Sequence, residues 1–563
     1  MQLEIPSPEP AVDSAQTKTD ALTDGNTASD QGIENNFLRE NLVVSGWGLL
    51  GTVLVAVFFI YCSYLPIYHT DIWGHVSYGQ SMIETGKLPV EDPYVELAAG
   101  VEMINNAWLS QLLFGWLVNQ SGPQGIGDGY AVICLATFLA FAATFSVSTG
   151  NRMLGFCLAV CTWLMITFRL AIVRPELLGE LCFALVLLQI AIADRVRRKS
   201  ENKNLTYPIW MWFSLPLTFM LWANLHGAYI VGFAVFGAAV LGSLGTAIFK
   251  HRSVSGVWTD KQLRADVMLV QLSLLAACLN PYGIDLLLQT ALFPTHPNLK
   301  TVLEWTPLEI ISLEGIPMAT SWLFAAFFIR HSKVRFPIRD VILLLVLSLA
   351  VCLRVRMIAW YSPVYFFVMA PHVADVFRQV SQIQFVAKLQ SVFGFMSRPT
   401  FHIALVTGFV CYLAFAFTPI SRHAMGGTVR PLDQIVSKQT PIGITNYFKE
   451  HPQEGLIYAP QWWGDWINWE LDGDVKVFVS TNSIHLVPPE VWNHYMTISR
   501  GRPGSQALLT RYRINTMVVS KDLQPGLVKM FEGDKDWKAT FSDDISVIFE
   551  RTTSSATTKV AAH

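Results

Sequence analysis

Charged side chains are scarce in this sequence. Asp, Glu, Lys and Arg make up 15% of the 563 residues, whereas soluble domains carry about 25%. The net charge of -2 argues against nucleic acid as a partner, because that binding needs a basic face. Residues 421–563 contain no G-x-G-x-x-G or P-loop sequence, so no phosphate-binding loop is predicted in the polar C-terminal part. Apolar residues make up 52% and recur in runs of roughly 20, the length that spans a bilayer.

Cysteine motifs are missing as well. The eight cysteines all fall inside apolar runs, and the chain has no CxxC pair and no Cys/His zinc spacing. We therefore expect small core residues without disulfides or structural zinc.

The first 35 residues contain few large apolar side chains and are rich in Ser, Thr, Asp, Gly and Gln. This composition predicts disorder. The segment is too long and too poor in basic residues for a signal peptide, so the first apolar run is expected to be a retained helix. Residues 1–40 would then form a cytoplasmic tail.

Hydropathy predicts a transmembrane helical bundle over residues 41–420, mainly α, with about eleven spans. Basic clusters occur at 195–199, 250–252, 330–335 and 378–398. The positive-inside rule places all four in the cytoplasm, which requires an internal N-terminus and an external C-terminus. The predicted spans lie near 43–64, 127–148, 153–173, 176–194, 208–225, 228–249, 265–280, 316–331, 339–355, 358–377 and 401–420.

One short apolar run decides this topology. Residues 108–118 are apolar but too few to cross a bilayer, and their aromatic side chains suit the headgroup layer. Counting them as a span would place the basic cluster 195–199 outside. We therefore predict a juxtamembrane helix in the first external loop.

Residues 421–563 are more polar and are predicted to form an external α/β domain. Strands are expected at 455–459, 475–479 and 515–519, with helices near 443–450, 489–499 and 504–513. Trp463, Trp466 and Trp469 recur every three residues, so a helix would place them on one side. They could stack on a glycan, although packing against the membrane domain is the favoured interpretation.

With this topology, polar residues from five external loops share one side of the membrane. That convergence carries more functional weight than any single motif. The residues are Asp71, His75 and Asp92; Arg174 and Glu176; Asn224 and His226; Glu304 and Trp305; and Arg354 and Arg356.

The order and spacing of these residues resemble the C-superfamily (GT-C) of membrane glycosyltransferases, and within it the bacterial RgtA/B/C/D-like members. Two positions depart from that pattern: Ile72 follows Asp71 where a second acidic residue is common, and Ser480 stands where an acidic residue is expected. The matching motifs are Asp71-x-Trp73-x-His75, Asp92-Pro93-Tyr94, Arg174-Pro175-Glu176, Asn224-Leu225-His226-Gly227, Asn280-Pro281-Tyr282-Gly283 and Glu304-Trp305.

The resemblance implies an inverting hexosyl or pentosyl transferase of a bacterial inner membrane. Its donor would be a polyprenyl-phosphate sugar, and its acceptor a cell-envelope glycan, lipid or protein on the external face. The sugar, the acceptor and the oligomeric state stay open.

Asp71 is the candidate base for the acceptor hydroxyl, mainly on this resemblance, and its alternative is a helix-capping aspartate. His75 lies four residues later, so a helix would place both side chains on one face. The pair could share a substrate site or hold a divalent metal, although a structural hydrogen bond is the favoured interpretation for His75.

Arginine matches phosphate bidentately, so Arg174 could hold the carrier phosphate beside Glu176. Arg354 and Arg356 could do the same. Each could instead be an interfacial anchor, because arginine extends toward lipid headgroups.

The remaining candidates could contact substrate or serve the fold. Asp92 could bind acceptor or metal, or shape the turn before Pro93. Asn224 and His226 could bind sugar or brace a tight corner between helices. Glu304 could accept bonds from sugar hydroxyls and Trp305 could cover a sugar face, or the tryptophan could belong to the interfacial belt.

Two other functions stay open. A transporter or flippase of lipid-linked glycan would carry polar groups near the bilayer midplane. A non-catalytic assembly protein that binds envelope glycan would expose an aromatic surface on its C-terminal domain.

Overall fold

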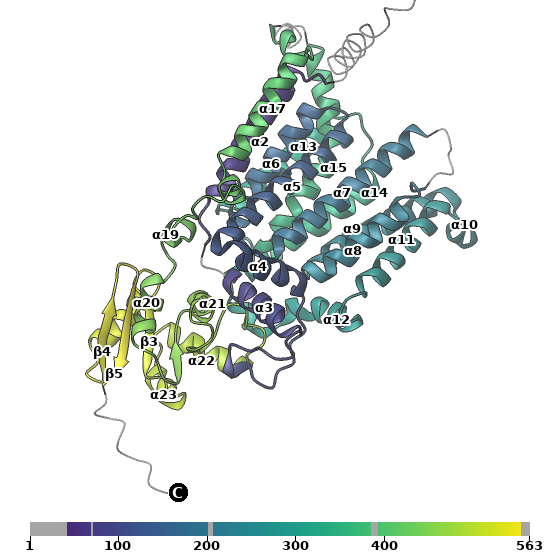
Figure 1. Cartoon of the computed structure of the whole chain (residues 1–563). Helices are drawn as coiled ribbons and strands as arrows, with labels where there is room; N and C mark the ends of the chain where they lie inside the picture. Colours follow the sequence, from purple (N-terminus) through teal and green to yellow (C-terminus); the bar gives the residue numbers. More distant parts are fainter. Residues whose placement is uncertain (1–41, 69–70, 201–205, 384–391, 553–563) are drawn as a thin grey trace, which may run out of the picture.

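A computed structural model describes residues 42–68, 71–200, 206–383 and 392–552. A bundle of long helices fills most of the molecule, and a small sheet lies beside one end of it (Figure 1). The expected disordered tail falls outside the described residues.

The structure has a helix at each of the eleven apolar segments. Four of these helices, α2, α5, α7 and α9, are long and apolar enough to cross a membrane. The chain is therefore a multi-pass membrane protein, and the count of eleven spans stays a prediction. The helices are α2 (Gly46–Tyr64), α5 (Pro123–Thr149), α6 (Arg152–Leu170), α7 (Glu176–Lys199), α8 (Met211–Leu225), α9 (Tyr229–His251), α11 (Lys261–Ala277), α13 (Gly315–His331), α14 (Ile338–Leu353), α15 (Ile358–Ser381) and α17 (Phe401–Ala416).

The predicted juxtamembrane segment forms α4 (Trp108–Ser121), a helix of 14 residues. It packs against α3 (Ile72–Thr85), which follows the first long helix. Glycines allow the two backbones to meet, because a Cβ on Gly79 would lie 1.9 Å from the Gln111 carbonyl oxygen. The segment between α2 and α5 therefore contains two tightly packed short helices.

Short helical turns complete the membrane-proximal part. They include α12, which follows the Asn280-Pro281-Tyr282-Gly283 turn, and two turns that carry Glu304 and Arg356. These elements are η1 (Glu96–Ala98), α10 (Val254–Trp258), α12 (Ile284–Leu292), η2 (Phe293–Thr295), η3 (Pro297–Thr301), η4 (Leu303–Trp305), η5 (Val355–Met357), η6 (Gly394–Ser397), α18 (Pro419–Ala424) and α19 (Leu432–Ile435).

The C-terminal part contains a five-stranded mixed sheet in the order β2-β1-β3-β5-β4. Strands β2, β1 and β3 run parallel to one another, and β5 and β4 form an antiparallel hairpin beside β3. The sequence did not predict this hairpin. The bounds are α20 (Ile442–Glu450), β1 (Leu456–Tyr458), α21 (Gln461–Glu470), β2 (Lys476–Val477), α22 (Pro489–Ser499), α23 (Ser505–Arg511), β3 (Thr516–Ser520), α24 (Pro525–Glu532), β4 (Trp537–Ser542) and β5 (Ser546–Arg551).

The tryptophans of α21 attach this sheet-containing part to α3. The ring of Trp73 lies 4.9 Å from that of Trp466 and 4.4 Å from that of Trp469. The indole of Trp469 also donates to Gln80 Oε1 at 3.1 Å. The packing interpretation of these tryptophans therefore fits the structure, because Trp463 and Trp466 are buried.

All eight cysteines are free, but only three of them are buried, two are partly buried and three are exposed. Cys157, Cys161 and Cys411 are exposed on the outer faces of α6 and α17. An apolar run in a membrane helix includes the face that contacts lipid, so it does not by itself identify the core.

Candidate functional site

Asp71 immediately precedes α3, and its side chain makes no capping hydrogen bond. Its Oδ1 atom is buried and has no hydrogen-bond partner among the described residues. A buried polar atom without a partner is rare in folded proteins and calls for an explanation. The capping alternative is thus absent from this structure, and the free oxygen is available to a ligand.

A chain of hydrogen bonds fixes the orientation of His75. The backbone N–H of Ala107 donates to Asn105 Oδ1 at 3.2 Å, so the Asn105 amide nitrogen faces Gln111. That nitrogen donates to Gln111 Oε1 at 2.5 Å, and Gln111 Nε2 then donates to His75 Nδ1 at 3.0 Å. The proton of the neutral ring therefore sits on Nε2, which lies 3.9 Å from Asp71 Oδ2.

The imidazole of His75 is neutral near pH 7. Burial lowers the pKa of His75 to about 4, with the Asp71 carboxylate opposing the shift and Arg174 adding to it. Its Nε2–H can thus donate a hydrogen bond to a carboxylate or a substrate oxygen while carrying no net charge.

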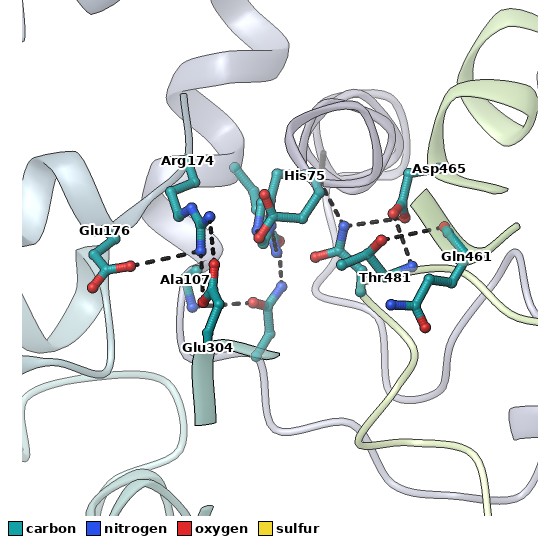
Figure 2. Close-up of polar contacts among 12 residues, drawn as sticks. His75, Ala107, Arg174, Glu176, Glu304, Gln461, Asp465 and Thr481 are labelled. Carbon is teal, nitrogen blue, oxygen red and sulfur yellow. Dashed lines mark hydrogen bonds and ion pairs between the residues drawn. The ribbon is translucent and has the colours of Figure 1, made fainter. Parts of the chain in front are cut away.

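Arginines and glutamates from distant segments form one largely buried ion cluster, of which Figure 2 shows Arg174 beside Glu176 and Glu304. Arg174 from the α6–α7 loop and Arg169 from the end of α6 each lie 2.9 Å from Glu304 Oε1. Glu176, at the start of α7, lies 3.4 Å from Arg169 and 3.4 Å from Arg356. Three arginines thus surround two carboxylates, which leaves one positive charge in excess.

Ionisation within this cluster is strongly favoured. Burial alone would raise the pKa of Glu304, but Arg174, Arg169 and Arg356 hold it well below its usual range. The Nε atoms of Arg169 and Arg174 are buried without hydrogen-bond partners among the described residues. The cluster therefore retains both charge and donors that an anion could use.

Trp305 serves as a platform for two cations. The guanidinium of Arg356 lies 4.6 Å from the centre of its ring and that of Arg354 lies 5.8 Å away. Arg354 also donates to the Trp305 carbonyl oxygen at 2.7 Å. Glu304 and Trp305 thus position the predicted arginines. The sequence had instead predicted that these two residues contact a sugar.

Asp71, the arginine cluster and the two histidines affect one another's pKa values. Burial would lower the pKa of Arg174, but the charge of Asp71 raises it. Arg174 in turn lowers the pKa of His75. Burial lowers the pKa of His226 to about 4; the charge of Glu176 opposes this shift, and Arg356 and His75 add to it. Asp71, His75, Arg174 and His226 therefore lie within electrostatic range of one another.

A second carboxylate comes from the C-terminal part (Figure 2). Asp465 in α21 accepts the Thr481 backbone N–H at 2.9 Å. Asn482 donates both to Asp465 Oδ1 at 3.1 Å and to the Asp71 carbonyl oxygen at 2.8 Å. Burial raises the pKa of Asp465 to about 7, and the Asp71 charge adds to the shift. Asp465 thus supplies an acidic group beside Ser480, where the resemblance led us to expect one.

Two residues that were predicted to bind substrate make hydrogen bonds within the protein instead. Asp92 accepts from the Tyr78 hydroxyl and the Tyr94 backbone N–H, both at 2.8 Å, as a turn-forming residue would. Asn224 accepts from the Trp108 indole at 2.9 Å and donates to the Leu279 carbonyl oxygen at 3.1 Å. Neither keeps an evident free group for substrate, so their roles as ligands stay predictions without structural support.

A metal ion does not fit the predicted pair well. Within the described ranges, no group of three His, Cys, Asp or Glu side chains lies close enough to hold one. Nδ1 of His75 already accepts a hydrogen bond from Gln111, and its other nitrogen carries the proton. We therefore derive no step through a metal.

The sequence reading missed Arg169, Asn105, Gln111, Asp465 and Asn482. A charged residue close to the end of an apolar helix is a usable signal, and Arg169 meets it. Nothing local indicated a role in the site for the other four. Asn105 acts through Gln111, six residues later, and the other three contact residues that are more distant in the sequence.

No protein-family model and no curated protein matches this chain. Among solved structures, oligosaccharyltransferase AglB from Archaeoglobus fulgidus, in complex with an inhibitory peptide and a dolichol-phosphate, is 12% identical, with a TM-score of 0.49 over 91% of this chain and 75% of that chain. ArnT from Cupriavidus metallidurans, bound to undecaprenyl phosphate, is 12% identical, with a TM-score of 0.47 over 90% of this chain and 98% of that chain. TM-scores below 0.5 carry no argument about activity, so the chain's own residues must support any function.

Proposed function

We propose that this chain is a membrane glycosyltransferase of the GT-C kind, which moves a sugar from a polyprenyl phosphate to a cell-envelope acceptor on the external face. The observation that carries the proposal is the free, buried Oδ1 of Asp71 within electrostatic range of an arginine cluster that has one positive charge in excess. A base and a phosphate-binding group are the two elements that this transfer requires.

In the proposed reaction Asp71 takes the proton of the acceptor hydroxyl as that oxygen forms a bond to the anomeric carbon. The bond from the anomeric carbon to the phosphate oxygen breaks at the same time, and its electron pair leaves with the polyprenyl phosphate. A single displacement inverts the configuration at the sugar. Arg174 and Arg356 would stabilise the negative charge of the departing phosphate.

His75 and His226 would assist without changing charge. His75 would donate its Nε2–H toward the Asp71 carboxylate or the acceptor, in the orientation that Gln111 imposes. His226 lies close enough to Glu176 and Arg356 for their charges to affect its pKa. Both rings would therefore contribute to the site as neutral hydrogen-bonding groups.

The test is a sugar-transfer assay with the purified full chain and a polyprenyl-phosphate sugar. Asp71→Asn should lower the rate at least about 100-fold, because general-base catalysis contributes on the order of 100- to 10,000-fold. Asp433→Asn, which changes an exposed carboxylate of α19, is the matched control and should retain the wild-type rate. Unchanged transfer in Asp71→Asn would remove Asp71 as the base.

The structure bears on the two rival functions differently. A glycan-binding assembly protein should expose the α21 tryptophans, but Trp463 and Trp466 are 2% and 0% exposed. A flippase would move the lipid-linked sugar between leaflets and release no sugar from the carrier. Transfer to an acceptor without movement of the donor would distinguish the two in one vesicle experiment.

A further inference from the structure

A polar cavity lies at the end of the bundle opposite Asp71. It has a volume of about 500 Å³ and is formed where α7 and α9 end and where α11 and α14 begin. Figure 1 shows these helix ends on the far side of the bundle from α3 and α21. No residue of the proposed transfer site lines it.

Each acidic side chain of this cavity already has a partner. Asp194 lies 3.0 Å from Arg339, which also lies 2.8 Å from Asp340. Asp260 pairs with Lys250 at 3.4 Å, and Asp266 accepts from the Tyr207 hydroxyl at 2.7 Å. The carboxylates are therefore satisfied by the protein itself and leave no evident site for a cation.

Two arginines of the same cavity have no such partner. Arg198 and Arg335 both line it, and within the described ranges neither makes an ion pair or a hydrogen bond. They come from two of the basic clusters that the sequence singled out, one after α7 and one after α13. The cavity therefore holds two guanidinium groups that contact no carboxylate of the described residues directly.

A buried histidine points to a ligand independently. His372 in α15 lines the cavity and is 1% exposed, yet both of its ring nitrogens lack hydrogen-bond partners in the described chain. Its ring packs 5.2 Å from that of Phe336. A buried imidazole with two unused nitrogens would gain a hydrogen bond from any oxygen-bearing group that enters.

We propose that this cavity binds a phosphate group, held by Arg198 and Arg335 and hydrogen-bonded by His372. Guanidinium groups suit phosphate because they offer several N–H donors in a fixed plane. The apolar walls, which include Ile338, Phe367 and Pro371, suit the glycerol and acyl portion of a lipid. Basic pockets between membrane helices commonly accept anionic headgroups. A phospholipid or a soluble phosphate could supply the group.

The test uses the full chain in a neutral detergent, with native mass spectrometry and thermal stability as readouts. The probes are dispersed phosphatidylglycerol, the zwitterionic phosphatidylcholine and inorganic phosphate. The variant Arg198→Gln/Arg335→Gln removes both free cations from exposed positions, which favours retention of the fold. Lys199→Gln/Arg330→Gln removes equal charge from the same two clusters at residues outside the cavity.

Wild type and the control double variant should retain phosphatidylglycerol more tightly than phosphatidylcholine. The Arg198→Gln/Arg335→Gln variant should bind phosphatidylglycerol roughly tenfold more weakly or worse. His372→Leu should weaken binding in the same direction by a smaller factor. Binding of inorganic phosphate alone, lost in the same variants, would support the site and identify a soluble source.

Equal weakening in both double variants would overturn the proposal, since general attraction to basic loops would then explain the binding. Binding of neither anionic probe by wild type would overturn it as well, as would retention of both lipids that Arg198→Gln/Arg335→Gln leaves unchanged. None of these outcomes depends on sugar transfer, because the cavity shares no residue with the proposed transfer site.

Discussion

Nε2 of His75 lies 3.9 Å from Oδ2 of Asp71, the residue immediately before α3. The distance is longer than a hydrogen bond. An acceptor hydroxyl could therefore contact both groups, or a small movement could bring the two side chains into direct contact. The orientation of the ring depends on Gln111, whose amide nitrogen donates to the opposite ring nitrogen.

Replacement of Gln111 by Glu should therefore lower the transfer rate at pH 7. A carboxylate at this position accepts a hydrogen bond from Nδ1 instead of donating one, so the proton of the neutral ring moves away from Asp71. The added negative charge should also raise the pKa of His75 from about 4. The acid limb of the pH–rate profile would shift to higher pH, which separates loss of orientation from simple loss of fold.

Gln111→Asn is the companion variant for this prediction. It keeps the amide but shortens its reach, so the rate should fall while the acid limb stays in place. Identical pH profiles for wild type and Gln111→Glu would contradict the orienting role of Gln111.

The contact between α3 and the C-terminal part leaves no room for a side chain at Gly74. A Cβ there would lie 2.2 Å from Asn482 Nδ2 and 2.4 Å from Asp465 Oδ1. Gly74→Ala should therefore displace residues 481–482 and α21 from α3, at a cost of about 1–3 kcal/mol typical of overpacking. Protease cleavage near residues 425–430 should accelerate and transfer should fall.

Gly51→Ala is the matched control, because a Cβ at that helical glycine meets no atom within 4 Å. Equal cleavage rates in the two alanine variants would show that the docking tolerates the added methyl group.

The sequence predicted the helices well because each depends on a continuous apolar run. The eleven predicted segments all contain helices, and residues 108–118 fall within a helix too short to span. The hairpin of β4 and β5 escaped detection because the outer strand β4 is largely solvent-accessible and lacks a clean apolar alternation. Exposed faces likewise explain why Cys157 and Cys161 were misplaced in the core.

The site was only partly predictable for a different reason. Arg174, Glu176, Glu304 and Arg356 were identified separately, and the structure brings them into one cluster. Their mutual neutralisation could not be foreseen, because Arg174 and Glu304 are 130 residues apart. Asp465 carried no local sign of function, since its position beside α3 depends on how the C-terminal part docks.

Arg356 should bind the phosphate of the donor before the reaction as well as stabilise the phosphate that departs. Its guanidinium lies over Trp305 and 3.4 Å from Glu176, so it can turn toward a phosphate without a large movement. Arg356→Gln should raise KM for the polyprenyl-phosphate sugar about tenfold, because a hydrogen bond to a charged group contributes roughly 1.5–3 kcal/mol. Trp305→Leu should raise KM less, through loss of the platform.

The control for Arg356 is Arg430→Gln. Arg430 also stacks on an aromatic ring, with 5.2 Å to the centre of Tyr64, but belongs to neither ion cluster. Its KM should remain that of wild type. A fall in kcat with unchanged KM in Arg356→Gln would place the arginine's effect in the chemical step instead.

Asp465 should make stability depend on pH in a direction opposite to that of a salt-bridged carboxylate. Burial raises its pKa to about 7 in the folded chain, against about 3.9 in an unfolded one. The unfolded chain therefore releases this proton first, and stability is lost as pH rises from about 4 to about 7. Asp465→Asn cannot lose stability in this way. Relative to wild type, its free energy of unfolding should therefore increase by up to about 1.4 kcal/mol per pH unit over this interval, and its melting temperature should increase with it. Melting of the detergent-solubilised chain, followed by tryptophan fluorescence, provides the measurement, with Asp433→Asn as the control that should parallel wild type. A constant difference between Asp465→Asn and wild type from pH 4 to pH 8 would mean that Asp465 is ionised throughout, and the C-terminal part would then present a permanent negative charge to Asp71.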